Sequence, residues 1–286
     1  MDHGRFDPDA ADREVLDGPL GLGAPQGIHR HSDLTHCVVL DPVLRVPRLL
    51  ALLCHTPILA RVGLPSTCGA DHDGAVDVDV LVERVRGLAA DPARAGQRTL
   101  VGITGPPGAG KSTFAELLIE ALRRNGIVAV LVPMDGYHLA QRVLDERGLA
   151  DVKGAPQTFD GAGYRALLDR LRQNGSDVVF APEFRREIEE PVAGAIAVGP
   201  AVEVVLTEGN YLLLDDEPWA GARGLLDEVW YLDLDPQVRQ GRLAERHRRF
   251  GRSDEDAWGR TTGSDEANAA LVEAGRARAD LVVPLG

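Results

Sequence analysis

One phosphate-binding sequence constrains the fold of this chain more than any other feature. It follows the pattern G-x-x-x-x-G-K-S from Gly105 to Ser112, and Thr113 comes directly after it. In loops of this pattern, backbone N–H groups and a helix N-terminus converge on an anion, the lysine bridges the outer phosphates and the hydroxyl can ligate magnesium. The residues expected to bind nucleotide phosphates are therefore Gly105, Pro106, Pro107, Gly108, Ala109, Gly110, Lys111, Ser112 and Thr113.

The chain's use of basic residues supports this interpretation. Of its 31 lysine and arginine residues only two are lysines, Lys111 and Lys153. A compact ammonium on a flexible stem reaches between phosphates inside a tight loop, where a planar guanidinium does not fit. A lysine at this position of an arginine-rich chain therefore indicates phosphate chemistry.

The pattern of apolar residues predicts how the chain folds around the loop. A β-branched and apolar run precedes the loop and a segment with helical spacing follows it, and strands and helices then alternate. This order predicts an α/β fold of the P-loop NTPase type, with a doubly wound, mostly parallel sheet and helices on both faces. The predicted strands are residues 98–104, 127–133, 177–181, 202–207, 228–234 and 281–284, and the predicted helices are 76–90, 112–125, 160–173, 236–250 and 264–279.

The first part of the chain has a different character. Residues 1–75 are rich in Pro, Gly, His and Asp, and their apolar runs keep neither a period of two nor one of 3.6. We expect a poorly structured N-terminal extension. It is a disordered tail, an extension from a start codon placed too far upstream, or a small regulatory segment. The folded domain is expected to span residues 76–286.

Charge and cysteine content limit the partners and the compartment. The net charge of -13 leaves no basic excess for nucleic acid or an anionic membrane, which favours a small-molecule substrate. The three cysteines are odd in number and show no C-x-x-C spacing, so we expect a reducing cytoplasm and no structural metal. The start is acidic, without the order of a secretory signal, and no apolar run is long enough to span a bilayer. The sequence leaves open whether the protein forms a homodimer.

Two carboxylates follow predicted strands, at the sheet edge where ligands bind in doubly wound folds. Asp135 is interpreted as the base that accepts or orients a substrate hydroxyl, and the alternative is an N-cap for a helix beginning near His138. Glu208 ends an apolar strand and is expected to hold magnesium together with Ser112, the alternative being a loop cap. Tyr137 and His138 are equally consistent with substrate contact and with packing.

Basic side chains gather on one predicted helix. Arg239, Arg242, Arg246 and Arg249 recur at steps of three and four, so they share one helix face. We interpret this face as an arginine-rich lid that stabilises charge on the transferred phosphoryl group, with Arg242 and Arg246 as catalytic candidates. The alternative is a solvated face paired with Glu245, Asp254 and Glu255.

Taken in order, the motifs resemble those of a known group of enzymes. Over residues 76–286 the chain is similar to the superfamily of phosphoribulokinase, uridine kinase and bacterial pantothenate kinase, and most of all to bacterial nucleoside/nucleotide kinase family proteins. The motifs that carry the resemblance are GPPGAGKST (105–113), MDGYH (134–138), KGAPQTFD (153–160), APEFRREIEEP (181–191) and TEGNYLLL (207–214).

The resemblance implies roles for several residues. It implies Asp135 as the base, Glu208 at the magnesium, and an arginine-bearing lid. Lys153 falls on a motif position shared with pantothenate kinases, and we count it among the substrate-binding candidates. Charged residues just past a strand end can fix a small polar molecule, so Phe184, Arg185 and Arg186 are expected to contact the acceptor, the alternative being a surface hairpin. Uridine kinases carry an Asp-Ser-Phe-Tyr type of segment where this chain has DGYH, so their substrate does not transfer to it.

These features together predict a cytoplasmic kinase that uses ATP and Mg²⁺ to transfer the γ-phosphoryl group to a hydroxyl of a nucleoside, sugar or pantothenate-like alcohol. Two other classes stay open. A nucleotide-binding regulator would keep the loop without needing Asp135 or the arginine face. A GTP-dependent switch or metallochaperone would resemble proteins with an N/T-K-x-D motif, whereas the second lysine of this chain lies in the sequence DVKG.

Overall fold

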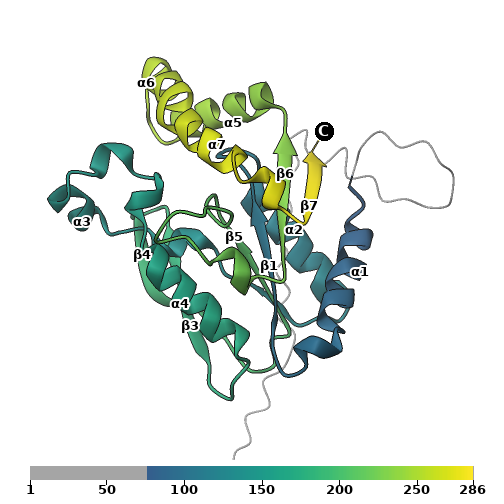
Figure 1. Cartoon of the computed structure of the whole chain (residues 1–286). Coiled ribbons are helices and arrows are strands. Elements are labelled where there is room, and N and C mark those ends of the chain that lie inside the picture. Colours follow the sequence, from purple (N-terminus) through teal and green to yellow (C-terminus); the bar gives the residue numbers. More distant parts are fainter. Residues whose placement is uncertain (1–75, 286) are drawn as a thin grey trace, which may run out of the picture. The chain divides into compact units, whose positions relative to one another are not determined.

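The computed structural model describes residues 76–285 (Figure 1). The expected N-terminal extension, residues 1–75, lies outside this range. The strands are β1 (Thr99–Thr104), β2 (Ala129–Leu131), β3 (Val179–Arg185), β4 (Glu190–Val198), β5 (Val204–Glu208), β6 (Glu228–Leu234) and β7 (Leu281–Leu285). The helices are α1 (Val78–Ala89), α2 (Lys111–Arg124), α3 (Gln141–Glu146), α4 (Gly161–Arg172), α5 (Pro236–Arg249), α6 (Asp254–Arg260) and α7 (Glu266–Glu273).

Five strands form a parallel sheet in the order β2-β5-β1-β6-β7. The carboxyl ends of all five strands therefore share one edge. The phosphate loop follows β1 at this edge, and the register pairs Ile103 with Glu208, so Glu208 lies beside the loop. Asp135 follows β2 in a short 3-10 turn, Met134–Tyr137. The predicted α/β class with a mostly parallel sheet is confirmed.

Alternation along the strands creates a core on each face of the sheet. On one face, Val101 and Ile103 of β1 pack with buried residues of α1 and α2, including Leu122. On the other face, Leu100 packs with α4, whose Leu168 is fully buried. Figure 1 shows α1 and α2 on the opposite side of the sheet from α4. Helices on both faces are thus confirmed, and they fix the edge that carries the phosphate loop.

A separate two-stranded antiparallel sheet is present, which the sequence had indicated only as the surface-hairpin alternative for the segment around Phe184–Arg186. The predicted strand 177–181 continues to Arg185 and pairs with β4, which no sequence pattern indicated. Most of β4 is exposed, so its run of small and apolar residues does not alternate as a half-buried strand would. We name this unit, Val179–Val198, the hairpin. Its base is anchored in the core by buried residues such as Ala181 and Val198.

Two other boundaries differ from the prediction. The strand expected at 127–133 is β2, which covers only three residues at the edge of the sheet. The helix expected at 264–279 is shorter: α7 ends at Glu273, and a 3-10 turn follows over Arg276–Arg278. A π-helical turn over Thr261–Asp265 connects α7 to α6, which lies before the predicted range. Ser253 starts α6 by accepting a hydrogen bond from the Asp256 amide, a capping signal that lies outside the predicted range.

No helix within residues 76–285 combines the length and apolar character needed to cross a membrane.

Candidate nucleotide and acceptor site

The phosphate loop adopts a conformation that depends on glycine. Gly108 and Gly110 have positive φ angles of 83° and 91°. A Cβ built on Gly108 would lie 2.7 Å from Cγ of Leu243 and 3.0 Å from the carbonyl oxygen of Arg239, both on α5. The lid helix α5 therefore packs directly against the loop, and a side chain at position 108 would push the two apart.

The loop leads into a helix N-terminus that is open to an anion. Gly110 caps α2 without a side-chain hydrogen bond, and the first turn of α2 carries no acidic residue. Its unpaired N–H groups and the helix dipole favour negative charge. The Lys111 Nζ atom donates to the carbonyl oxygens of Gly105 and Pro106, at 2.9 and 3.2 Å. Burial lowers the pKa of Lys111 to about 8, although Glu208 and Asp135 oppose the shift.

Ser112 and Glu208 form the candidate metal site. The Ser112 hydroxyl donates to Oε1 of Glu208 over 3.1 Å, and Glu208 is only 5% exposed. Burial and the nearby Asp135 raise the pKa of Glu208, while Lys111 and the Ser112 hydrogen bond lower it. Within residues 76–285, His, Cys, Asp and Glu form no cluster of three or more that would hold a metal. This donor set fits Mg²⁺, which is typically bound by one or two protein oxygens together with phosphates and water.

Asp135 lines the same cleft as Ser112 and Glu208, and it follows β2, the strand that pairs with β5. It lies in the 3-10 turn after β2, and its half-buried carboxylate is 3.7 Å from Nη2 of Arg186. The alternative interpretation of Asp135 as a helix cap is wrong, because α3 begins only at Gln141 and Glu190 binds the Gln141 amide instead. Asp135 is thus free to contact a ligand.

The hairpin closes over Asp135 and completes a cleft. A Cβ on Gly136 would collide with the backbone carbonyl of Pro182, so the absence of a side chain at position 136 lets β3 approach the turn. The resulting cavity has a volume of about 290 Å³. Its walls are Ser112, Glu116, Leu131, Pro133, Asp135, Glu183, Phe184, Arg186, Ile196 and Glu208.

The structure separates the other substrate candidates into two groups. Phe184 and Arg186 line the cleft, whereas Arg185 pairs with Glu183 at 2.5 Å and does not. Tyr137 packs edge-on against Tyr164 of the core, with 5.6 Å between ring centroids. The predicted segment is therefore a surface hairpin, and part of it also faces the cleft.

His138 and Lys153 lie behind the cleft wall. The His138 ring stacks on Phe159 and meets Phe184 edge-on, at centroid distances of 3.9 and 4.8 Å. Burial lowers the pKa of His138, and Lys153 and Arg186 lower it further against Asp135. The Lys153 ammonium lies over the Phe184 ring at 5.4 Å and binds protein groups, as described below. Both residues thus contact Phe184, which forms part of the wall.

The arginines on the predicted face of α5 lie in different environments. Arg239 is 3% exposed, donates to the carbonyl of Pro107 at 3.3 Å and pairs with Glu266, so it supports the phosphate loop. Arg242 lies next to Gly110, where its Nη1 atom would be 3.7 Å from a Cβ. Arg249 lies on the surface and pairs with Glu245, as the solvated-face alternative predicted.

The exposed Arg246 of α5 interacts electrostatically with Asp135 of the cleft and with Asp265. Desolvation lowers its pKa, Arg186 lowers it further, and Asp265 and Asp135 raise it. Within residues 76–285 its guanidinium forms no hydrogen bond or ion pair. Arg242 and Arg246 are therefore the members of the face that remain available to a phosphate.

Two cleft residues were not predicted as site residues. Glu116 lies one helical turn after Ser112 and so shares its face of α2, a spacing that could have identified it. Ile196 belongs to β4, which the sequence did not indicate, so no signal pointed to it.

Several known proteins are similar to this chain. The family described as methylmalonyl Co-A mutase-associated GTPase MeaB matches residues 81–137, which hold the phosphate loop but not Glu208, the hairpin or α5. The yeast YFH7 crystal structure from Saccharomyces cerevisiae, 20% identical, covers 73% of this chain and 99% of its own with a TM-score of 0.64, which shows a shared fold.

Two further relatives are similar in sequence over most of their length. The structure described as a "putative fructose transport system kinase" from Silicibacter sp. TM1040 is 38% identical, with 73% of this chain and 99% of that chain covered and a TM-score of 0.67. A Schizosaccharomyces pombe protein named "Putative uridine kinase" is 35% identical over 196 residues, which is 65% of this chain and 83% of the relative. The chain therefore belongs to the superfamily of P-loop kinases that includes uridine kinase and phosphoribulokinase.

Proposed function

We propose that this protein transfers the γ-phosphoryl group of Mg²⁺-ATP to a hydroxyl group of a small metabolite. The observation that carries the proposal is one cleft that holds the metal candidates Ser112 and Glu208 together with Asp135. The phosphate loop opens at the same sheet edge. A regulator that only binds a nucleotide would not need a partly buried carboxylate in a cleft beside the phosphate loop.

Each side chain has a role that follows from its position. The amides of the α2 N-terminus and Lys111 bind the outer phosphates. Asp135 orients the acceptor hydroxyl and accepts its proton as the oxygen attacks phosphorus. Arg242 and Arg246 stabilise the negative charge on the transferred group. Mg²⁺, when bound at Ser112 and Glu208, neutralises charge on the phosphate oxygens.

The sheet order separates the two substrates. The acceptor cleft lies on the β2 and β5 side of the loop. A second cavity, of about 360 Å³, lies on the β6 side and is bounded by Pro106, Leu234, Arg239 and Arg276 among others. Because the phosphates occupy the loop between them, the nucleoside part of ATP has room in the second cavity while the acceptor occupies the first.

The residues of the cleft walls favour an acceptor that has both apolar and polar parts. Phe184, Ile196 and Leu131 are apolar, and Arg186 and Glu183 are charged. A small molecule with a carbon skeleton and several polar groups fits such walls, as a nucleoside, a sugar or a pantothenate-like alcohol does.

The test is a screen of these three acceptor classes with Mg²⁺-ATP, read by ADP release and by mass detection of the phosphorylated product. Lys111→Ala is the matched control, and we expect it to lose at least about a hundredfold in turnover while the fold survives. Product formation by the wild type but not by Lys111→Ala supports the proposal. Tight ATP binding without any phosphorylated product would favour the regulator instead.

A further inference from the structure

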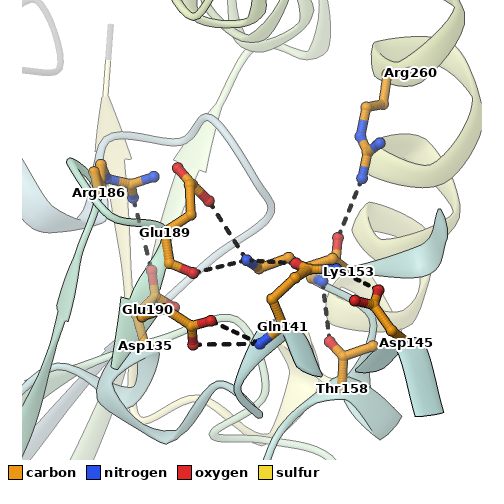
Figure 2. Close-up of polar contacts among 10 residues, drawn as sticks. Asp135, Gln141, Asp145, Lys153, Thr158, Arg186, Glu189, Glu190 and Arg260 are labelled. Atoms are coloured by element: carbon orange, nitrogen blue, oxygen red, sulfur yellow. Dashed lines mark hydrogen bonds and ion pairs between the residues drawn. The ribbon is translucent and has the colours of Figure 1, made fainter. Parts of the chain in front are cut away.

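Lys153 joins two segments that wall the acceptor cleft. Its Nζ atom donates to Oε1 of Gln141 at 3.2 Å and to the carbonyl of Glu189 at 2.9 Å, and it lies 3.6 Å from the Glu189 carboxylate. Figure 2 shows these contacts converging on one ammonium from α3 and from the hairpin. The side chain is only 16% exposed, so it has little freedom to turn into the cleft.

A second contact joins the same two segments. The α3 N-terminus has no cap of its own, and the Glu190 carboxylate accepts from the Gln141 amide at 3.0 and 3.3 Å. The neighbouring Glu189 lies in the hairpin tip, residues 185–190, and has a positive φ of 54°. This conformation turns the chain so that the Glu189 carbonyl faces Lys153. The hairpin tip thus supplies both the acceptor for Lys153 and the missing helix cap.

The hairpin depends on such contacts for its position. A two-stranded sheet is marginally stable alone, and residues 185–189 of this one are exposed. Arg186, which reaches Asp135, lies in this exposed stretch. Phe184, which lines the cleft, has the Lys153 ammonium over its ring. The position of both cleft residues therefore follows the position of the tip.

We propose that Lys153 is a positioning residue, which holds the hairpin tip against α3 so that Arg186 and Phe184 stay in place for the acceptor. Its ammonium acts through Glu189 and Gln141 and does not contact the substrate. The kinetic part of this inference rests on the proposed phosphotransfer, whereas the structural part does not. A third contact, from Nη2 of Arg260 to the Lys153 carbonyl at 3.5 Å, connects α6 to the same loop.

The structural test compares Lys153→Met, Lys153→Arg and a control, Arg142→Gln, by amide hydrogen exchange of the full chain. Arg142 is 86% exposed on α3, and among residues 76–285 its ion-pair partner is Glu146 of its own helix. We expect Lys153→Met to speed exchange in residues 185–190 and 141–146 by about tenfold or more, because local opening of the tip becomes easier. Lys153→Arg should retain part of the protection from exchange that Lys153→Met loses. The exchange rates of the phosphate-loop amides should be the same in all three variants as in the wild type.

The kinetic test uses the best acceptor from the screen. Lys153→Met should raise the acceptor KM by about tenfold, with kcat and the KM for ATP within about threefold of wild type. A raised acceptor KM with unchanged exchange at the tip would overturn the inference, because it would mean direct substrate contact. Unchanged exchange alone also overturns it. If no acceptor is found, the proposed function fails, and the exchange experiment still decides the role of Lys153.

Discussion

The parallel sheet and the hairpin meet at one cleft, but they are held in place by different forces. Every residue of β1 is buried between two helix layers, whereas most residues of β4 are exposed. The phosphate loop is therefore positioned by the core, while Arg186 and Phe184 are positioned by a few polar contacts at the hairpin tip. The hydrophobic core is insensitive to single polar substitutions far from it, but a tip held by Lys153 and Glu190 is not.

Under the proposed function, this difference separates nucleotide binding from acceptor binding within one site. The nucleotide half of the site comprises the phosphate loop with Lys111 and Ser112. It keeps its geometry because the backbone of β1, β5 and α2 defines it. The acceptor half comprises the cleft walls that the hairpin supplies, including Phe184 and Arg186. Substitutions in the hairpin can change its shape without disturbing Lys111 or Ser112.

The largest effect is expected where the two halves meet, at Asp135. Asp135→Asn keeps the size of the side chain but removes the basic carboxylate, so turnover should fall by roughly two to four orders of magnitude while ATP affinity and melting temperature stay near wild type. Steady-state kinetics, nucleotide titration and thermal unfolding measure the three quantities. Asp151→Asn, an exposed carboxylate on the following loop, is the control. Normal turnover in Asp135→Asn would remove this residue from the mechanism.

The next prediction compares the stability of the two regions. Leu168 is fully buried in α4, and Leu168→Ala should lower the free energy of unfolding by about 2–5 kcal/mol through lost burial and a cavity. Phe180 of β3 is 57% exposed, so Phe180→Ala should cost less than about 1 kcal/mol. Urea unfolding measures both. Equal losses would show that the outer face of the hairpin is covered in solution, and the comparison would then fail.

The nucleotide half was predictable from the sequence because local patterns specify it. The loop motif, the flanking apolar periods and the strand ends at Asp135 and Glu208 each depend on neighbouring residues. The structure brings Ser112, Asp135 and Glu208 together in one cleft. The order of the strands could not be read from these patterns, but parallel strands put their carboxyl ends at one edge in any order.

The acceptor half was less predictable because its contacts join residues far apart in the chain. Lys153 meets Glu189 across 36 positions, and nothing local shows that its partner is a backbone carbonyl instead of a substrate. The sequence likewise suggested Asp135 as a helix cap, since the capping carboxylate, Glu190, lies 49 residues after Gln141. On α5 the spacing identified a shared face, but only packing shows that Arg239 supports the loop while Arg249 stays on the surface.

A smaller effect should distinguish members of that arginine face. Arg246→Met removes a charge that interacts with Asp135, so we expect a fall in turnover of about ten- to a hundredfold. Arg249→Met changes a surface residue that pairs with Glu245 at 3.3 Å, and turnover should stay within about twofold. Both variants retain the long apolar stem, which controls for lost packing. Equal kinetics in the two variants would show that α5 does not act as a lid.

The smallest expected effect is the contribution of His138, which lies behind Phe184, to the pH dependence of the free energy of unfolding. Burial between Phe159 and Phe184 lowers the pKa of His138 below its ordinary value of 6.5, so the unfolded chain binds a proton more readily than the folded one. The contribution of this ring to stability is therefore complete above pH 6.5 and is lost as the pH falls through 6.5 toward the folded-state pKa. His138→Phe keeps an aromatic ring in the stack and cannot titrate. The free energy of unfolding should fall more for the wild type than for His138→Phe between about pH 7.5 and 5.5, and urea unfolding at both pH values measures this difference. Parallel pH profiles of the two proteins would show that folding does not lower the pKa of His138, and the prediction would then be wrong.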